Sequence, residues 1–111
     1  MIEIEEYLTD DGRSPFAEWL DTLDAAAAAR ITAVLHWMET GNLGDVAPVG
    51  AGVSERRIDF GPGYRIYFGT IGNRRIIRLI VLLCGGTKRQ QRRDIPKARQ
   101  RWKDYRKRKR D

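Results

Sequence analysis

The chain has 111 residues, of which 41% are hydrophobic and 32% charged, with a formal net charge of +6. This length fits one domain, residues 1–111, whose core needs no metal or disulfide. The single cysteine, Cys84, excludes an internal disulfide and is typical of a reducing compartment. The sequence holds no apolar run near the roughly 18 residues of a membrane span, and its acidic N-terminus is unlike a signal peptide. The expectation is therefore a soluble cytoplasmic protein with no metal and no other cofactor.

Charge is divided unevenly along the sequence. Residues 1–54 contain two basic and ten acidic side chains, a net of −8, whereas residues 55–111 contain nineteen basic and five acidic ones, a net of +14. Such asymmetry predicts a C-terminal half that faces a polyanion and an N-terminal half that faces solvent or a protein partner. The last residues, 106–111, also fit a frayed, solubilising tail. A tail does not explain arginines inside predicted strands.

The first half of the chain predicts one strand and two helices. Residues 2–8 alternate apolar and polar side chains, as a strand does. Ser14 followed by Pro15 predicts a helix start, and apolar residues then recur at helical spacing. Asp24 caps a second helix of the same pattern, which Gly41 ends. We expect the two helices to form a hairpin that packs its apolar faces on a sheet.

The second half predicts a loop, three strands and a basic helix. Residues 42–53 include four Gly or Pro and predict a long loop. A hairpin follows, and then a strand over residues 75–84 that is apolar on both faces, as in the interior of a sheet. The closing helix is capped by Thr87 or Asp94, and Pro96 favours the start at Asp94. The predicted order is β-α-α-β-β-β-α, an α+β fold with a small antiparallel sheet.

The hairpin over residues 54–68 carries the candidate site. Its turn, Gly61-Pro62-Gly63, has Pro where φ is fixed and Gly where φ is positive. Alternation directs Ile58, Phe60, Ile66 and Phe68 to one face, and Arg57, Asp59, Arg65 and Tyr67 to the other. The first face predicts a core. The second predicts a solvent-open surface that binds phosphate, because the guanidinium fork matches phosphate oxygens and Tyr67 offers a ring for stacking on unpaired bases.

Two stretches carry a resemblance to a known family. The run GNLGDVAPVGAGVSERRIDFGPGYRIYF and the later LLCGGTKRQQRRDI resemble the RelE/ParE superfamily of type II toxins, and more narrowly its HigB-like addiction module killer proteins. The resemblance covers nearly the whole chain and implies a RelE-like fold. It also implies a toxin that cleaves mRNA on the ribosome and arrests translation and growth. Its expected partners are mRNA, the ribosome and a cognate antitoxin from an adjacent gene, of helix-turn-helix type, in a possible heterotetramer.

The resemblance implies a set of site residues. The arginine of the family's GYR element corresponds to Arg65, the basic strand residue to Arg57, and the basic pair after the last strand to Lys88 and Arg89. Two positions depart from the family pattern, because Arg56 replaces a common leucine and Ala47 replaces a common lysine. The expected catalytic residues are Arg57, Arg65 and Lys88, and the expected substrate-binding residues are Tyr67, Arg89, Gln91 and Asp59.

The residues leave the proton donor and acceptor open. Lys88 or Tyr67 could serve if neighbouring cations lower their pKa, and Asp59 could be a base or could pair with Arg57 or Arg65. His36, the only histidine, fits a surface or packing role on the second helix better than a catalytic one. Two other functions therefore stay open: a ParE-like gyrase poison without nuclease activity, and a plain nucleic-acid-binding module.

Overall fold

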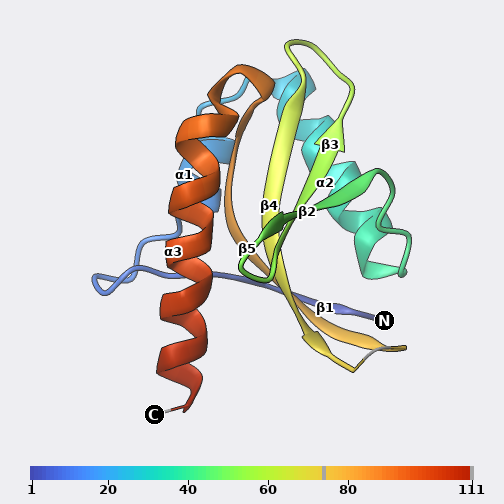
Figure 1. Ribbon diagram of the computed structural model, residues 1–111. Coiled ribbons are helices and arrows are strands. Elements are labelled where there is room, and N and C mark those ends of the chain that lie inside the picture. The colour runs from blue at the N-terminus through green and yellow to red at the C-terminus, as the bar shows by residue number, and fades with distance from the viewer. Residues whose placement is uncertain (74, 111) are drawn as a thin grey trace.

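A five-stranded sheet, in the order β1-β5-β4-β3-β2, forms the centre of the computed structural model, which describes residues 1–73 and 75–110 (Figure 1). The strands are β1 (Glu3–Glu6), β2 (Val46–Gly50), β3 (Val53–Ile58), β4 (Tyr64–Gly72) and β5 (Ile77–Thr87). The helices are α1 (Pro15–Asp21), α2 (Ala25–Glu39), the short 3-10 helix η1 (Lys88–Gln90) and α3 (Gln91–Arg110). The predicted α+β class is confirmed.

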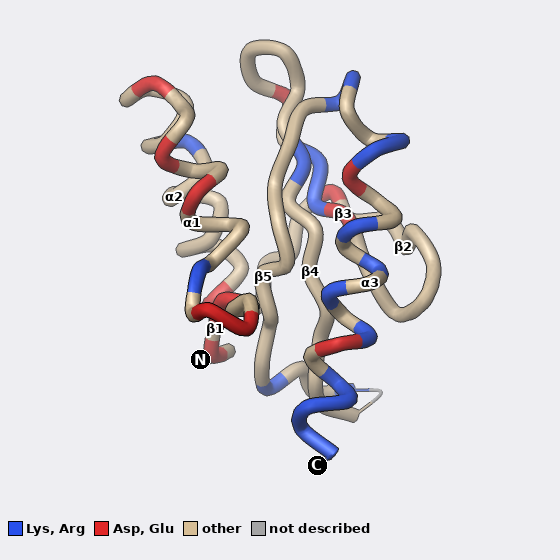
Figure 2. Tube along the Cα trace, turned by 90° about the vertical axis from the view of Figure 1, so that its left-hand side faces the viewer, with Lys and Arg blue, Asp and Glu red and all other residues tan. Residues whose placement is uncertain are grey.

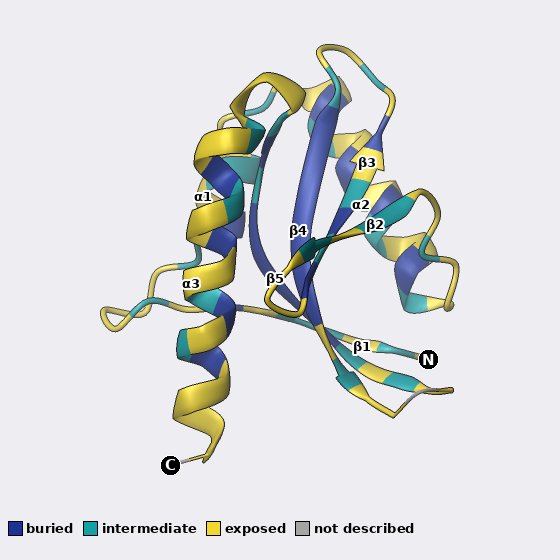
Figure 3. Cartoon of the chain, viewed as in Figure 1, coloured by how far each residue is buried: buried dark blue, intermediate teal, exposed yellow. Residues whose placement is uncertain are grey.

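The sheet is covered on both sides. Helices α1 and α2 lie on one face and α3 lies on the other, as Figure 2 shows edge-on. The core under α1 and α2 is built on Phe16, Ile31, Met38, Ile66 and Phe68, and the core under α3 is built on Val53, Tyr67, Leu83, Ala98 and Trp102. Strands β4 and β5 are therefore buried on both faces over most of their length (Figure 3).

Glycines in the two central strands let tryptophans lie against the sheet. A Cβ at Gly85 of β5 would collide with the ring of Trp19, and a Cβ at Gly69 of β4 would collide with the ring of Trp102. Both indoles thus occupy space that any other strand residue would fill. This close approach fixes α1 on one face of the sheet and α3 on the other.

Side-chain caps set the starts of the first two helices, as predicted. The Ser14 hydroxyl accepts the N–H of Ala17 at 3.0 Å, and Pro15 follows it as the first helical residue. The Asp24 carboxylate accepts the N–H of Ala27 at 2.9 Å. Each cap satisfies a backbone donor that the first helical turn leaves without a partner.

Two expectations about the sheet need correction. Strand β1 runs parallel to β5, with Glu3 opposite Leu79, so the sheet is mixed instead of wholly antiparallel. The stretch 42–53, predicted as a loop, contains the edge strand β2. Its Pro48 cannot donate a backbone hydrogen bond, but an edge strand needs donors on one side only. The observed order therefore has one strand more than predicted.

The boundaries of β5 and α3 also differ from the prediction. Gly85 and Gly86 do not end β5, because both pair with β4, opposite Ile66 and Arg65. Helix α3 starts at Gln91, before the expected Asp94, and holds Pro96 inside it. A proline there removes one helical hydrogen bond, which the long apolar contact of α3 with the sheet offsets. Residues 106–110, for which a frayed tail was one of the interpretations, are helical, and Asp111 lies outside the described residues.

Within residues 1–73 and 75–110, no helix combines the length and the apolar character needed to cross a membrane.

Candidate nucleic-acid interface

Arg57 and Arg65 are direct neighbours across the antiparallel pair β3 and β4. Both side chains lie on the face that α3 covers, so the predicted shared face is correct. Their exposure differs, however, because the side chain of Arg57 is 43% exposed and that of Arg65 only 10%. The prediction that both side chains are exposed to solvent is therefore wrong for Arg65, which is buried near the N-terminal end of α3.

A buried carboxylate, which the sequence reasoning missed, joins the two arginines. Glu55 is 1% exposed. Its Oε2 lies 3.2 Å from the Nε of Arg57, and its Oε1 lies 3.6 Å from the Nε of Arg65. The side-chain amide of Gln91 donates to Oε1 at 2.5 Å, so the first residue of α3 is tied to β3. We call these four residues the Glu55 cluster.

The sequence did contain a signal for Glu55. It lies two residues before Arg57 on the same strand, and side chains two apart share a face. A carboxylate on the face of two arginines is expected to pair with them, because a buried charge needs a counter-charge. The pairing orients the Arg57 fork from behind and leaves much of that side chain at the surface.

Tyr67 does not fulfil its predicted role. It is 0% exposed, and its hydroxyl has no hydrogen-bond partner among the described residues. Burial raises the pKa of Tyr67, and the nearby carboxylates of Glu55 and Asp94 raise this pKa further. The stacking and acid–base roles expected for it are incompatible with this position. Alternation placed Tyr67 on the correct face, but the packing of α3 on that face could not be inferred from alternation.

Lys88, Arg89 and Asp59 follow the ends of β5 and β3, at the same end of the sheet as Arg57. Lys88 and Arg89 are exposed in η1, directly after β5. The backbone N–H of Lys88 donates to the carbonyl of Gly63 at 2.8 Å, which holds η1 against the hairpin turn. Asp59 is exposed after β3. In the described part of the chain the acidic partners of Arg57 are Glu55 and Asp45, so the expected pairing with Asp59 is not found.

The residues that depart from the family pattern lie outside the Glu55 cluster. Arg56 is half-buried on the opposite face of β3, where desolvation lowers the pKa of its guanidinium. Its guanidinium lies against Gly44, where a Cβ would be only 2.6 Å from it. Ala47 pairs with Glu55 across β2 and β3. The side chain of His36 is 78% exposed on α2, on the other side of the sheet, and its Nδ1 is 3.9 Å from a Glu39 oxygen.

The arrangement suits the binding of an anion at the end of the sheet where β3 and β5 finish. Lys88 and Arg89 present exposed positive charge there, and Arg57 adds an exposed guanidinium that pairs with Glu55 through Nε and with Asp45 through Nη1. The charge of Arg65 is compensated by Glu55. A guanidinium held from behind by a carboxylate loses little freedom when its outer N–H groups bind phosphate oxygens. Within residues 1–73 and 75–110, no three His, Cys, Asp or Glu side chains are grouped closely enough to hold a metal ion.

Comparison with known proteins gives one informative relative. No protein-family model matches the chain, and no solved structure matches it. A Haemophilus influenzae protein, described as uncharacterized, is 41% identical over 85 residues, which span 76% of this chain and 82% of that protein. At this identity and coverage the two sequences share one fold and one ancestry, and the chain therefore belongs to the same protein family as this Haemophilus influenzae protein.

Proposed function

We propose that this protein is the toxin of a type II toxin–antitoxin pair, and that it arrests translation by cleaving mRNA on the ribosome. The observation that carries the proposal is the Glu55 cluster with the exposed cations beside it. One half of the chain is strongly basic, and Arg57, an exposed arginine of β3, is held by a buried carboxylate. The resemblance of the hairpin and the β5–α3 junction to RelE/ParE toxins supports the same function.

In this proposal Arg57 and Lys88 contact the scissile phosphate. The neighbouring 2′-oxygen attacks the phosphorus to form a 2′,3′-cyclic phosphate, the bond to the 5′-oxygen breaks, and the proton of the 2′-hydroxyl passes to that leaving oxygen. Negative charge concentrates on the phosphate oxygens in the transition state, where preorganised cations stabilise it most. Arg89 holds the adjoining backbone. Arg65 and Glu55 are positioning residues, because they are buried and act through Arg57. The ribosome holds the mRNA in place, so the toxin does not have to overcome the full entropic cost of positioning it.

The proposal also includes a neutralising partner. An antitoxin would cover the exposed cations at the end of β3 and β5, where a basic surface favours an acidic segment. Co-expression with the protein encoded by the neighbouring gene is expected to restore growth. If no neighbouring gene restores growth, the assignment to a toxin–antitoxin pair is refuted.

The decisive experiment measures mRNA cleavage after induction of the chain alone. Primer extension on a reporter message should show cuts that disappear when its start codon is removed. Arg57→Gln is expected to lower cleavage by about 100-fold, in the range found when one transition-state donor is lost. Arg13→Gln is the matched control, because Arg13 is an exposed arginine of the acidic half, with a side chain 63% exposed. Equal cleavage by the two variants would overturn the site.

The same strains separate the alternative functions. Growth arrest with intact mRNA and inhibited supercoiling by purified gyrase would replace the proposal with a gyrase poison. Intact mRNA without growth arrest would replace it with a nucleic-acid-binding module.

A further inference from the structure

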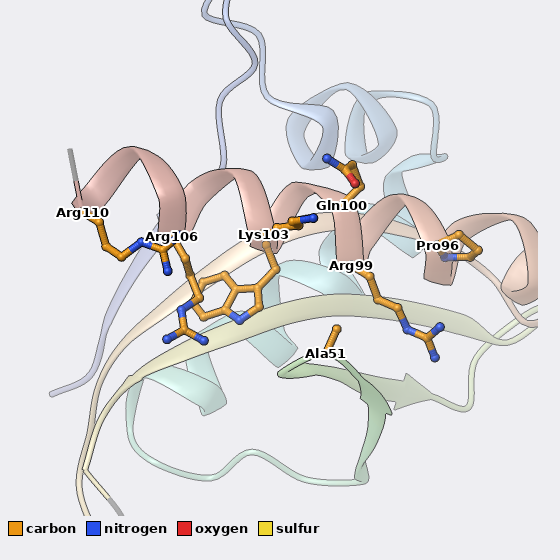
Figure 4. A pocket seen from close by; sticks show the side chains of 8 residues that line it. Ala51, Pro96, Arg99, Gln100, Lys103, Arg106 and Arg110 are labelled. Atoms are coloured by element: carbon orange, nitrogen blue, oxygen red, sulfur yellow. The ribbon is translucent and has the colours of Figure 1, made fainter.

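A groove runs along the outer side of α3, away from the Glu55 cluster (Figure 4). It is an open hollow of about 480 Å³ between α3 and the turn that joins β2 to β3. Its lining includes Ala51 of that turn and, from α3, Arg99, Trp102, Lys103, Arg106 and Arg110. Four of these six side chains are cationic.

The cations form a stripe at helical spacing. Arg99, Lys103, Arg106 and Arg110 follow one another at intervals of four, three and four residues, which places them on one side of the helix. We call them the α3 stripe. The rise of 1.5 Å per residue spreads Arg99 to Arg106 over about 10 Å. Each strand of a double helix carries one phosphate per roughly 3.4 Å of axis, so a stacked helical strand places about three phosphates over that length.

Two contacts hold the stripe in position. The Nε of Arg99 donates to the carbonyl of Val49 at 2.8 Å, and a Cβ at Gly50 would come within 2.8 Å of its guanidinium. The guanidinium carbon of Arg106 lies 6.0 Å from the centre of the Trp102 ring. These contacts use neutral groups, so they fix the side chains and leave their charge uncompensated.

No acidic side chain neutralises the middle of the stripe. Within residues 1–73 and 75–110, Arg99, Lys103 and Arg106 have no carboxylate within 4.0 Å. On the other side of α3, Arg108 pairs with both Asp104 and Asp10. Other cations of α3, among them Lys97 and Lys107, also have no carboxylate partner among the described residues. The groove differs in that four cations line one hollow, on a helix that Figure 2 shows to be strongly basic.

We infer that the α3 groove is a second binding surface, which holds the sugar–phosphate backbone of single-stranded RNA. Strand β2 leads from the first surface to the second, because Asp45 at one end contacts Arg57 and Val49 at the other contacts Arg99. At about 3.3 Å per residue the two contacts are roughly 13 Å apart along the strand. A single RNA strand of a few nucleotides spans that distance. The surface needs no base contacts, so the binding is independent of sequence.

The inference extends the proposed function but does not depend on cleavage, so it is tested by binding. The probe is a fluorescein-labelled 20-nucleotide RNA with 2′-O-methyl riboses, which cannot be cut through its 2′-oxygens. The test variant is Lys103→Gln with Arg106→Gln. The matched control is Lys97→Gln with Lys109→Gln, which removes the same charge from exposed positions of α3 outside the groove, Lys109 lying over the ring of Tyr105. Fluorescence anisotropy gives Kd between 50 and 300 mM salt, and circular dichroism confirms that both variants are helical.

Loss of two phosphate contacts is expected to raise Kd by about 10- to 30-fold near 0.1 M salt. It should also flatten the slope of log K against log salt by about 1.4, at roughly 0.7 per phosphate of a single strand. The control should change Kd by less than about threefold. Equal effects of the two variants, or an unchanged slope in the test variant, would overturn the inference. Tighter binding of a polyglutamate peptide than of RNA would overturn it too, in favour of an acidic protein partner.

The outcome is distinguishable from that of the cleavage experiment. If Arg57→Gln and Arg13→Gln cut mRNA equally but the α3 double variant binds RNA weakly, the RNA-binding groove is supported and the proposed cleavage site is refuted. If Arg57→Gln cuts mRNA less than Arg13→Gln but the α3 double variant binds RNA normally, only the RNA-binding groove is refuted.

Discussion

Replacement of Glu55 by Gln would remove the negative charge at the centre of the Glu55 cluster while keeping the size of the side chain. Arg65, with a side chain 10% exposed, would then be a buried cation without a counter-charge. Breaking a buried pair in this way costs about 3–5 kcal/mol. Arg57 adds little to this cost, because its side chain is 43% exposed and water screens its charge. Glutamine can still hydrogen-bond Gln91, so we expect a loss near the lower limit, about 3 kcal/mol.

Thermal unfolding followed by circular dichroism measures this loss. For a domain of this length, 1 kcal/mol corresponds to about 4 °C, so Tm should fall by about 12 °C. Glu18→Gln is the matched control, since its side chain is 56% exposed and its pairing with Arg13 is a surface contact. The Tm of that variant should stay within about 2 °C of the Tm of the parent protein. The double replacement Glu55→Gln with Arg65→Met should recover part of the loss, because it removes the orphaned charge. A Glu55→Gln variant with the same Tm as the parent protein would refute the stabilising ion pair between Glu55 and Arg65.

Two further predictions concern buried groups under α3. Tyr67→Phe removes a buried hydroxyl with no partner among the described residues, so the free energy of unfolding in urea should stay the same or rise by up to about 1 kcal/mol; a clear loss would mean that the hydroxyl is satisfied. Burial raises the pKa of the Cys84 thiol to about 11, so at pH 8 only about one thiol in a thousand is ionised. Alkylation by iodoacetamide should be at least 100-fold slower in the native protein than in guanidinium; similar rates would place Cys84 at the surface.

The local features of the fold were predictable because short-range chemistry determines them. Ser14 and Asp24 cap their helices as expected, and alternation correctly placed Arg57, Arg65 and Tyr67 on one face. The features that were missed depend on contacts distant in sequence. Nothing local shows that β1 pairs in parallel with β5. Gly85 and Gly86 suggested that the strand ends there. Gly85 instead makes room for the indole of Trp19, and a contact with a residue so distant in sequence leaves no local signal.

The sequence identified which cations belong to the candidate site, but it could not show which of their side chains are buried. The arginines were identified from spacing, but which of them meets solvent depends on where α3 crosses the sheet. That position is set by Trp102 on Gly69 and by Gln91 on Glu55. Neither contact has a local signature. The predicted ribonuclease, antitoxin and ribosome contacts remain predictions.

The pairing of β1 with β5 delays completion of the molecule during its synthesis. Residues 3–6 leave the ribosome early, yet their partners are residues 79–82, and Tyr7 and Glu5 bond to Asp104 and Tyr105 near the other end of the chain. At 5–20 residues per second, the first strand waits about 4–15 s for its neighbour. Gln91, which closes the Glu55 cluster, emerges later still. A nascent chain therefore cannot assemble the Glu55 cluster before Gln91 has been synthesised.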